Sequence, residues 1–198
     1  MRTDNHNNNK KEARAKETYL SIVQAAVKLF ARQGYHKTTI SDLAQAIGLT
    51  SGAIFHHFAT KEAILTAVID WLERGIHIYS DITEREERGS IRMVEEVVRV
   101  MCEHFKRNPE ATICLAALAT EFAGGGHPLE TRIKEIYEVF VESFANCLRN
   151  HPRVSNPRAA AAAFFGAVQG IAVQGLLREG DQTIDELAEG FLSMLKEW

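Results

Sequence analysis

Apolar residues recur at helical spacing along almost the whole chain, and no segment shows the alternation of a strand. Glycine and proline interrupt this pattern, and the residues between the interruptions are long enough for helices. The predicted helices span about 13–32, 39–47, 50–57, a segment from 61 into the seventies, 90–107, 111–122, 129–150, 157–179 and 183–198. The pattern therefore predicts an all-α chain of about nine helices. The polar, Asn-rich residues 1–10 are predicted to be disordered, and the charged residues 81–89 to form a loop.

Two short helices joined by a tight turn are predicted around Gly48. Thr39 and Asp42 have the spacing of a capping box, with Asp in place of the usual Glu or Gln. Gly48 stands where a helix ends in a left-handed residue. Thr50 or Ser51 then provides the cap of a second helix. This arrangement is typical of a helix-turn-helix, in which the second helix enters the major groove of DNA.

The run GLTSGAIFHHFATKEAI at residues 48–64 resembles the DNA-binding signature of TetR-type one-component transcriptional regulators. The upstream run GYHKTTISDLA at 34–44 resembles it as well, and the whole likeness covers roughly residues 14–66. The resemblance implies a homodimeric repressor that leaves a pseudo-palindromic operator when a small effector binds. A cytoplasmic location is expected from three cysteines, Cys102, Cys114 and Cys147, without an export signal. Together with the polar N-terminal residues, the resemblance predicts three parts: a disordered arm at 1–10, a helix-turn-helix DNA-binding domain at 11–60 and an effector-binding and dimerisation domain at 61–198.

The expected contacts with double-stranded DNA come from the recognition helix at about 50–57 and from residues beside it. Ser51, Gly52 and Ala53 begin this helix and can approach base edges, but they are small, so their direct readout will be limited. His56 is long enough to donate a hydrogen bond to guanine or to a phosphate. The resemblance implies phosphate contacts for four residues, Thr38, Thr39, His57 and Lys61. Such contacts position a protein without reading sequence. The full expected set is Thr38, Thr39, Thr50, Ser51, Gly52, Ala53, Phe55, His56, His57 and Lys61.

Phe55 and His57 depart from the family pattern, which usually has tyrosines at these positions. Without a hydroxyl, Phe55 loses one hydrogen bond to a phosphate, whereas His57 can restore one. Thr39 has two interpretations that the sequence leaves open, a helix cap and a phosphate contact.

The net charge of −3 conceals an asymmetry between the two ends of the chain. Residues 1–62 carry a balance of +4, and residues 63–198 carry −7. A positive head on an acidic body suits a protein that presents one end to phosphates. Scatter of this size is also common in proteins that bind no nucleic acid.

Residues 157–179 are rich in alanine and contain Gly166, Gly170 and Gly175. A glycine inside a helix costs about 1 kcal/mol relative to alanine, so three of them call for a physical reason. They allow another helix to approach closely, either in a subunit interface or within the same protomer. The resemblance favours a homodimer in which residues 157–179 and 183–198 pair with their symmetry mates.

The resemblance also implies an effector cavity inside the body. Aromatic side chains at helical spacing are equally what an ordinary core contains, so each candidate has that second interpretation. Few charges lie on these apolar faces, which favours an apolar or aromatic effector with one or two polar groups. Glu121 and His104 are the polar groups expected to meet it, and no cofactor or metal site is expected. The candidate lining residues are Trp71, Met101, His104, Phe105, Cys114, Phe122, Tyr137, Phe140, Phe144 and Gln169.

The sequence bears on three alternative functions. The segment TICLAALATEF at 112–122 resembles that of relatives which sense electrophiles or oxidants through a cysteine, so Cys114 is a candidate sensor, although buried unreactive cysteines are common. An enzyme is not expected, because the chain has no phosphate-binding loop, zinc-ligand spacing or nucleophile elbow. A DNA-binding protein without an effector is the third alternative. No membrane segment is predicted, since no run of 18 apolar residues occurs.

Overall fold

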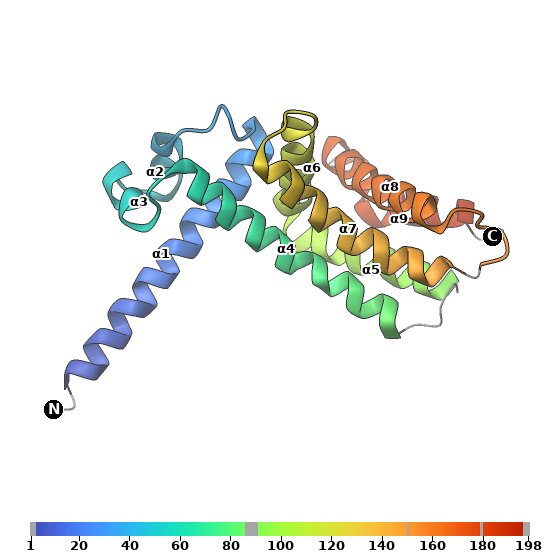
Figure 1. Cartoon of the computed structure of the whole chain (residues 1–198), viewed down its shortest axis with the longest axis horizontal. Coiled ribbons are helices and arrows are strands. Elements are labelled where there is room, and N and C mark those ends of the chain that lie inside the picture. Colours follow the sequence, from blue (N-terminus) through green and yellow to red (C-terminus); the bar gives the residue numbers. More distant parts are fainter. Residues whose placement is uncertain (1–2, 86–90, 150, 179, 196–198) are drawn as a thin grey trace.

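The computed structural model describes residues 3–85, 91–149, 151–178 and 180–195, with side chains outside 3–8 and 76–91. Over these residues the chain forms nine helices and no strand, which confirms the all-α prediction (Figure 1). The helices are α1 (Thr3–Gln33), α2 (Ile40–Ile47), α3 (Ser51–His57), α4 (Lys61–Arg85), α5 (Ile91–Arg107), α6 (Pro109–Phe122), α7 (Pro128–Leu148), α8 (Pro157–Leu177) and α9 (Ile184–Leu195).

The helices α1 to α3 form a small head around one apolar core. The apolar face of α1 contributes Ile22, Ala26 and Phe30, each with no exposed surface. Leu43 of α2 and Ile54 of α3 are equally buried and complete this core. The N-terminal half of α1 extends away from the head as a rod (Figure 1). Burial of these faces holds two very short helices that would be unstable alone.

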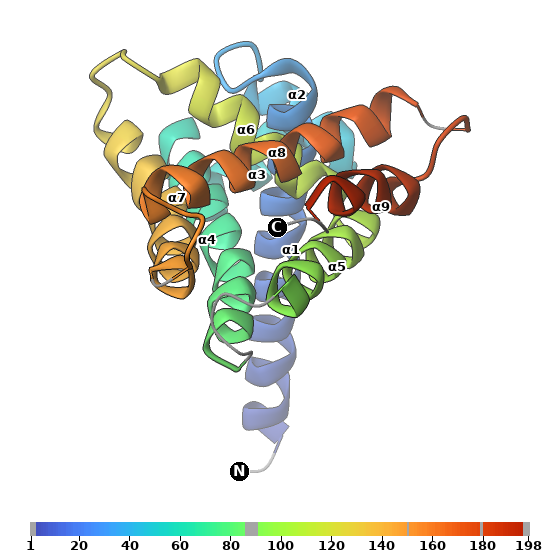
Figure 2. The same cartoon turned by 90° about the vertical axis from the view of Figure 1, so that its right-hand side faces the viewer.

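The helices α4 to α9 form the larger body. The helix α4 leads from the head into the body and packs against α7, which in turn packs against α8 (Figure 2). The helix α9 packs against α8 and α5, and α6 lies between the body helices and α1. Extensive packing of α1 on α6 therefore joins the head to the body, in addition to the continuous helix α4.

Two expected irregular segments are helical instead. The helix α1 begins at Thr3, so residues 3–10 are not the disordered arm that the composition predicts, while residues 1–2 lie outside the described residues. The helix α4 continues through residues 81–85, and residues 86–89 of the predicted loop lie outside the described residues. Extending an existing helix needs no new nucleation, and residues 3–10 and 81–85 contain neither glycine nor proline.

By length and composition alone, α8 is a helix that could cross a membrane. This is weak evidence, because core helices of water-soluble proteins pass the same test. Only 28% of its apolar window is buried inside the protomer. Apolar surface left exposed in this way is also typical of a protein–protein interface.

Candidate nucleic-acid interface

The turn between α2 and α3 has the local geometry that the sequence predicts. The backbone N–H of Thr39 donates to Asp42 Oδ2 at 2.8 Å, and the N–H of Asp42 donates to Thr39 Oγ1 at 3.1 Å. The Thr39 N–H also holds the pKa of the Asp42 carboxyl below its usual value, so the acceptor stays ionised. Gly48 is left-handed, with φ +67°, and the N–H of Leu49 donates to the Ala44 carbonyl. The capping-box and C-cap predictions are confirmed.

The recognition helix α3 buries one face and exposes the other. Ile54 is fully buried, whereas Gly52, Phe55 and His56 are exposed. The Phe55 ring is 52% exposed, which is unusual for an aromatic side chain without a partner surface. Thr50 Oγ1 accepts the N–H of Ala53 at 3.2 Å, so Thr50 is the N-cap. The half-buried Ser51, Ala53 and His57 flank the exposed face.

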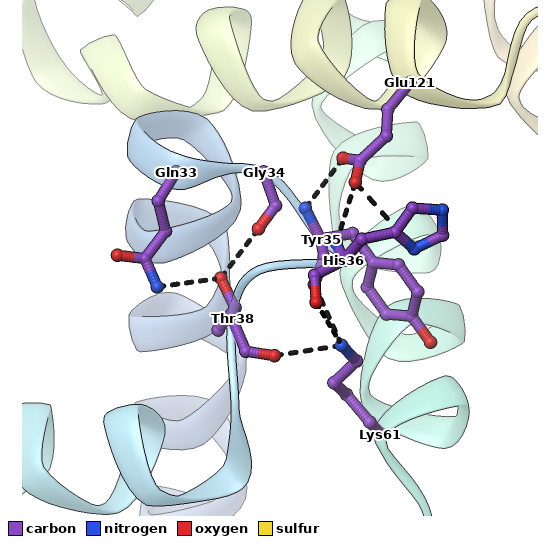
Figure 3. Close-up of polar contacts among 7 residues, drawn as sticks. All are labelled: Gln33, Gly34, Tyr35, His36, Thr38, Lys61 and Glu121. Carbon is purple, nitrogen blue, oxygen red and sulfur yellow. Dashed lines mark hydrogen bonds and ion pairs between the residues drawn. The ribbon is translucent and has the colours of Figure 1, made fainter.

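Thr38 is a structural residue in this conformation, contrary to its expected role as a phosphate contact. Its side chain has no exposed surface. Thr38 Oγ1 donates to the Gly34 carbonyl at 2.7 Å and accepts from Gln33 Nε2 at 3.3 Å (Figure 3). Thr39, by contrast, is exposed, and its hydroxyl proton remains available to donate after the oxygen has capped α2.

Lys61 is also engaged within the protein rather than facing a phosphate. Its Nζ donates to the carbonyl oxygens of Tyr35 at 2.9 Å, His36 at 3.3 Å and Thr38 at 2.9 Å (Figure 3). The ammonium also lies 4.2 Å from the centroid of the Tyr35 ring, within range of a cation–π contact. An ammonium has three protons to donate, and here the α1–α2 loop accepts all three. Only folding brings this loop to Lys61, so the sequence motif alone did not indicate these partners, and the phosphate contact stays a prediction.

We therefore expect Lys61→Met to weaken the head without changing the salt dependence of DNA binding. The loss of these hydrogen bonds should lower the free energy of unfolding in urea by about 1–3 kcal/mol. A lysine that gripped a phosphate would instead contribute roughly 0.9 to the slope of log affinity against log salt, or about 1.8 per dimer. Lys37→Met, which removes the same charge from an exposed position in the loop, is the control. If Lys61→Met alone reduced the slope of log affinity against log salt, Lys61 would contact a phosphate in the DNA complex.

The body contains a cavity of about 250 Å³ at the junction of α4, α5, α6 and α8. Its walls are mainly apolar, and Arg74 supplies the positive charge at its margin. Burial lowers the pKa of His104, and the neighbouring Arg107 lowers it further, so His104 is neutral at pH 7. The residues that line the cavity are Trp71, Leu72, Arg74, Gly75, Met101, His104, Asn108, Ala111, Thr112, Leu115, Phe165 and Gln169.

Seven of the ten candidate effector residues border one of three spaces. Trp71, Met101, His104 and Gln169 line this cavity. Phe122 and Tyr137 border a second cavity of about 650 Å³ between α6 and α7, which Gln169 shares. Gln169 Nε2 donates to the Tyr137 hydroxyl at 2.9 Å, so this hydrogen-bonded pair stands between the two spaces. Phe105 borders a separate pocket of about 490 Å³ beside the α8–α9 turn.

Phe140, Phe144 and Cys114 belong to the packed core. The Phe140 and Phe144 rings stack with centroids 5.7 Å apart, and Phe140 lies 4.5 Å from Phe165. Aromatic spacing alone could not separate core from cavity wall. Leu115 and Phe165, which do line the 250 Å³ cavity, were missed because nothing in their sequence context distinguishes them.

Cys114 has the environment of an unreactive thiol. It has no exposed surface, and burial raises its pKa well above the usual value for cysteine. Free N–H groups in the first turn of a helix favour a thiolate. Because α6 begins at Pro109, Cys114 lies beyond this first turn and does not benefit from them. The structure therefore does not support the sensor hypothesis.

Glu121 does not line the 250 Å³ cavity, where the sequence analysis expected it. Its side chain reaches the head instead, and its carboxylate accepts the N–H groups of Tyr35 and His36. Those residues are 86 and 85 positions away in the chain, so no local spacing could reveal the contact.

In the head of three helices, a capped turn joins α2 to the exposed helix α3. This arrangement defines a helix-turn-helix DNA-binding protein. Residues 22–68 match the family model described as bacterial regulatory proteins, tetR family. This match confirms the sequence resemblance to TetR-type regulators over the head.

Two relatives in sequence align with different lengths of the chain. The nucleoid occlusion factor SlmA of Haemophilus ducreyi is 24% identical over 135 residues, which cover 68% of this chain and 66% of the relative. The A-factor receptor protein of Streptomyces griseus is 45% identical over 60 residues, 30% of this chain and 22% of the relative. The chain thus aligns with less than two thirds of either relative.

Solved structures match over nearly the whole chain. AibR in complex with isovaleryl coenzyme A and operator DNA superposes with a TM-score of 0.73 at 20% identity, covering 89% of this chain and 96% of that one. The ketosteroid transcriptional regulator KstR2 of Mycobacterium tuberculosis also has a TM-score of 0.73, at 17% identity, covering 90% and 92%. At these identities the likeness establishes the fold of head and body together.

Proposed function

We propose that this chain is a cytoplasmic homodimeric repressor that leaves its pseudo-palindromic operator when a small effector enters the body. The observation that carries the proposal is the combination of an exposed recognition helix with an internal cavity in the helices that support it. The helix α4 lines the cavity and continues to the head, so an effector that displaced α4 would also displace α3.

The glycines of α8 support pairing between protomers. A Cβ added at Gly166 or Gly170 would meet nothing within 4 Å, so these glycines are not needed for packing inside the protomer. A Cβ at Gly175, in contrast, would lie 3.0 Å from Ile184 Cδ1, so this glycine allows α9 to pack closely on α8. Close packing within the protomer therefore accounts for Gly175, and the proposed subunit interface accounts for Gly166 and Gly170.

The same faces of α8 and α9 expose large apolar side chains. Val173, Leu177 and Met194 are 39%, 73% and 70% exposed in the isolated protomer. Val173 and Leu177 lie four residues apart, on one side of α8, and Gly166 and Gly170 extend this stripe. Pairing of α8 and α9 with their symmetry mates would cover it and would place two recognition helices on half-sites about 34–36 Å apart.

The cavity suits a small effector that is mostly apolar and is either uncharged or anionic. Its volume of about 250 Å³ is close to the lower end of the range of roughly 300–1,000 Å³ for ligand sites. Among the described residues that line it there is no Asp or Glu, whereas Arg74 provides a guanidinium. A cationic effector would therefore be desolvated without a counter-charge.

The experiment that tests this function measures fluorescence anisotropy on duplexes that tile the DNA beside the gene, across a salt series. We expect nanomolar binding to one pseudo-palindromic segment, with a steep salt slope. Gly52→Glu should abolish it, because the new carboxylate would face the phosphates. The nearest atom that its Cβ would meet is Thr50 Oγ1 at 3.9 Å, and an acidic residue stabilises the start of a helix, so α3 should stay folded. Thr131→Glu, which places the same charge on an exposed position of α7, is the control and should retain binding.

A DNA-binding protein without a small effector is the second candidate, because the name of the relative aligned over 68% of the chain, a nucleoid occlusion factor, refers to the nucleoid and to no ligand. The operator duplex distinguishes the two. Small apolar acids and neutral aromatic compounds should raise the melting temperature and release the duplex if the cavity binds an effector. Specific DNA binding that none of them changes would favour the second candidate.

A further inference from the structure

Glu121, at the C-terminal end of α6, is a side chain of the body that binds the backbone of the head. The Tyr35 N–H donates to Glu121 Oε2 at 2.7 Å, and the His36 N–H donates to Glu121 Oε1 at 2.7 Å (Figure 3). Both carboxylate oxygens are therefore used on two successive amides of the α1–α2 loop. The His36 ring lies near the same carboxylate, with Nδ1 3.9 Å from Glu121 Oε1. Hydrogen bonds to an ionised acceptor are about twice as strong as neutral ones.

A glycine in the α1–α2 loop allows this carboxylate to approach the backbone closely. Gly34 has φ +82°, a conformation that side chains disfavour, and a Cβ there would lie 3.1 Å from Glu121 Oε2. The Phe122 ring packs beside the same loop, with its centroid 5.6 Å from that of Tyr35 and 5.6 Å from that of His36. Backbone, carboxylate and aromatic ring thus form one close contact between α6 and the head.

Lys61 binds the same loop from the opposite side, but from the start of α4 and not from α6 (Figure 3). Its three hydrogen bonds take carbonyl oxygens of the loop, while Glu121 takes the amide hydrogens. Lys61 is the first residue of α4, and only three residues separate it from the end of α3, so its contact lies where the body helix joins the head. Glu121 reaches the loop only through folding of the body, and its contact is the one that breaks if α6 shifts.

The helix α6 also forms a wall of the effector cavity. Its first two turns contribute Ala111, Thr112 and Leu115 to the lining, and Glu121 follows less than two turns further along the same helix. A helix transmits a displacement along its length because its backbone is hydrogen-bonded throughout. Cavity and loop are therefore connected by one rigid element.

We propose that Glu121 is the positioning residue through which the cavity controls the head. With its two hydrogen bonds in place, the α1–α2 loop holds α2 and α3 in the orientation that binds DNA. Displacement of α6 by an effector withdraws the carboxylate, and the loop and recognition helix lose that orientation. This inference rests on the proposed function, and it assigns the regulation of the same site to α6 in addition to α4.

The coupling can be tested without the natural effector, because linkage is reciprocal: if the cavity controls DNA binding, operator DNA must alter the cavity. Trp71 lines the cavity and serves as a fluorescent reporter in a Trp198→Phe background, since the chain has two tryptophans. The operator duplex found by tiling is titrated while Trp71 emission and duplex anisotropy are recorded. Hydrogen exchange of the Tyr35 and His36 amides is measured on the free protein.

In the Glu121→Ala variant we expect operator affinity to fall about tenfold, which corresponds to ~1.4 kcal/mol. The Trp71 response should disappear at saturating DNA, and the two amides should exchange faster. Glu121→Gln keeps the shape and one neutral acceptor and should be intermediate, which guards against a variant that fails to fold. Glu130→Ala is the matched control, because Glu130 also binds two backbone amides, those of Gly124 and Gly126, but within the body.

A Trp71 response that persists in Glu121→Ala, or that is absent from the wild type despite tight operator binding, would overturn the inference. So would an equal loss in Glu130→Ala, since the effect would then be general destabilisation. Absence of specific DNA binding by the wild type is a separate outcome that refutes the proposed function itself, and the inference with it.

Discussion

Gly170→Glu should convert the protein to a monomer that is folded but binds its operator about 10³-fold or more weakly. The Cβ has open space in the protomer, and replacing a glycine inside a helix favours the helix by up to about 1 kcal/mol, so the protomer itself should not be destabilised. In a dimer the same position would meet the α8 of its mate, and a buried unpaired carboxylate would oppose association. Sedimentation equilibrium gives the mass, and anisotropy gives the affinity.

Two further variants make this result specific. Gly170→Ala should keep the dimer or weaken it slightly, because a methyl group adds little bulk and no charge. Thr131→Glu places the same charge on an exposed position of α7 and should change neither mass nor affinity. If Gly170→Glu remains a dimer with full affinity, the protomers pair through another surface.

Phe140→Ala should lower the free energy of unfolding by about 3–5 kcal/mol. Its ring is 1% exposed and packs against Phe144, Phe164 and Phe165, so truncation leaves a void in the core. For a chain of this size the loss corresponds to a fall in melting temperature of roughly 6–20 °C. Urea unfolding and a thermal melt measure the two quantities.

The size of this effect distinguishes core from cavity wall. A side chain that bordered an empty cavity would have fewer neighbours to lose, and its truncation would cost less. Phe140→Leu retains most of the volume and should cost under about 1.5 kcal/mol if the site can repack. A loss below about 1 kcal/mol in Phe140→Ala would return Phe140 to the candidate effector residues.

Much of the head could be predicted because its chemistry is local. The capping box joins Thr39 to Asp42 within three residues, and Gly48 ends α2 in a conformation that glycine adopts without strain. The period of the apolar positions predicted the helices, because burial of one face stabilises each of them. The boundaries failed at residues 3–10 and 81–85, where polar composition indicated irregular structure but an adjoining helix extended.

The partners of individual side chains could not be predicted, since they depend on residues far away in the chain. Lys61 matched a motif position that implied a phosphate, yet the fold presents it with carbonyl oxygens 23 to 26 residues away. Cys114 matched a segment that implied a reactive thiol, yet the packing of α6 buries it. A motif specifies the type of residue, and the surrounding helices determine what it contacts.

By itself, the sequence determined the all-α class, the helix-turn-helix and the family, because these follow from hydrophobic period, caps and a contiguous motif. Only the tertiary structure decided which aromatic residues form the core and which line the cavity, and which α8 glycines face outward. It alone brought Glu121 to the head across 85 residues. Such contacts are set by the packing of whole helices, and no short segment contains the information that specifies them.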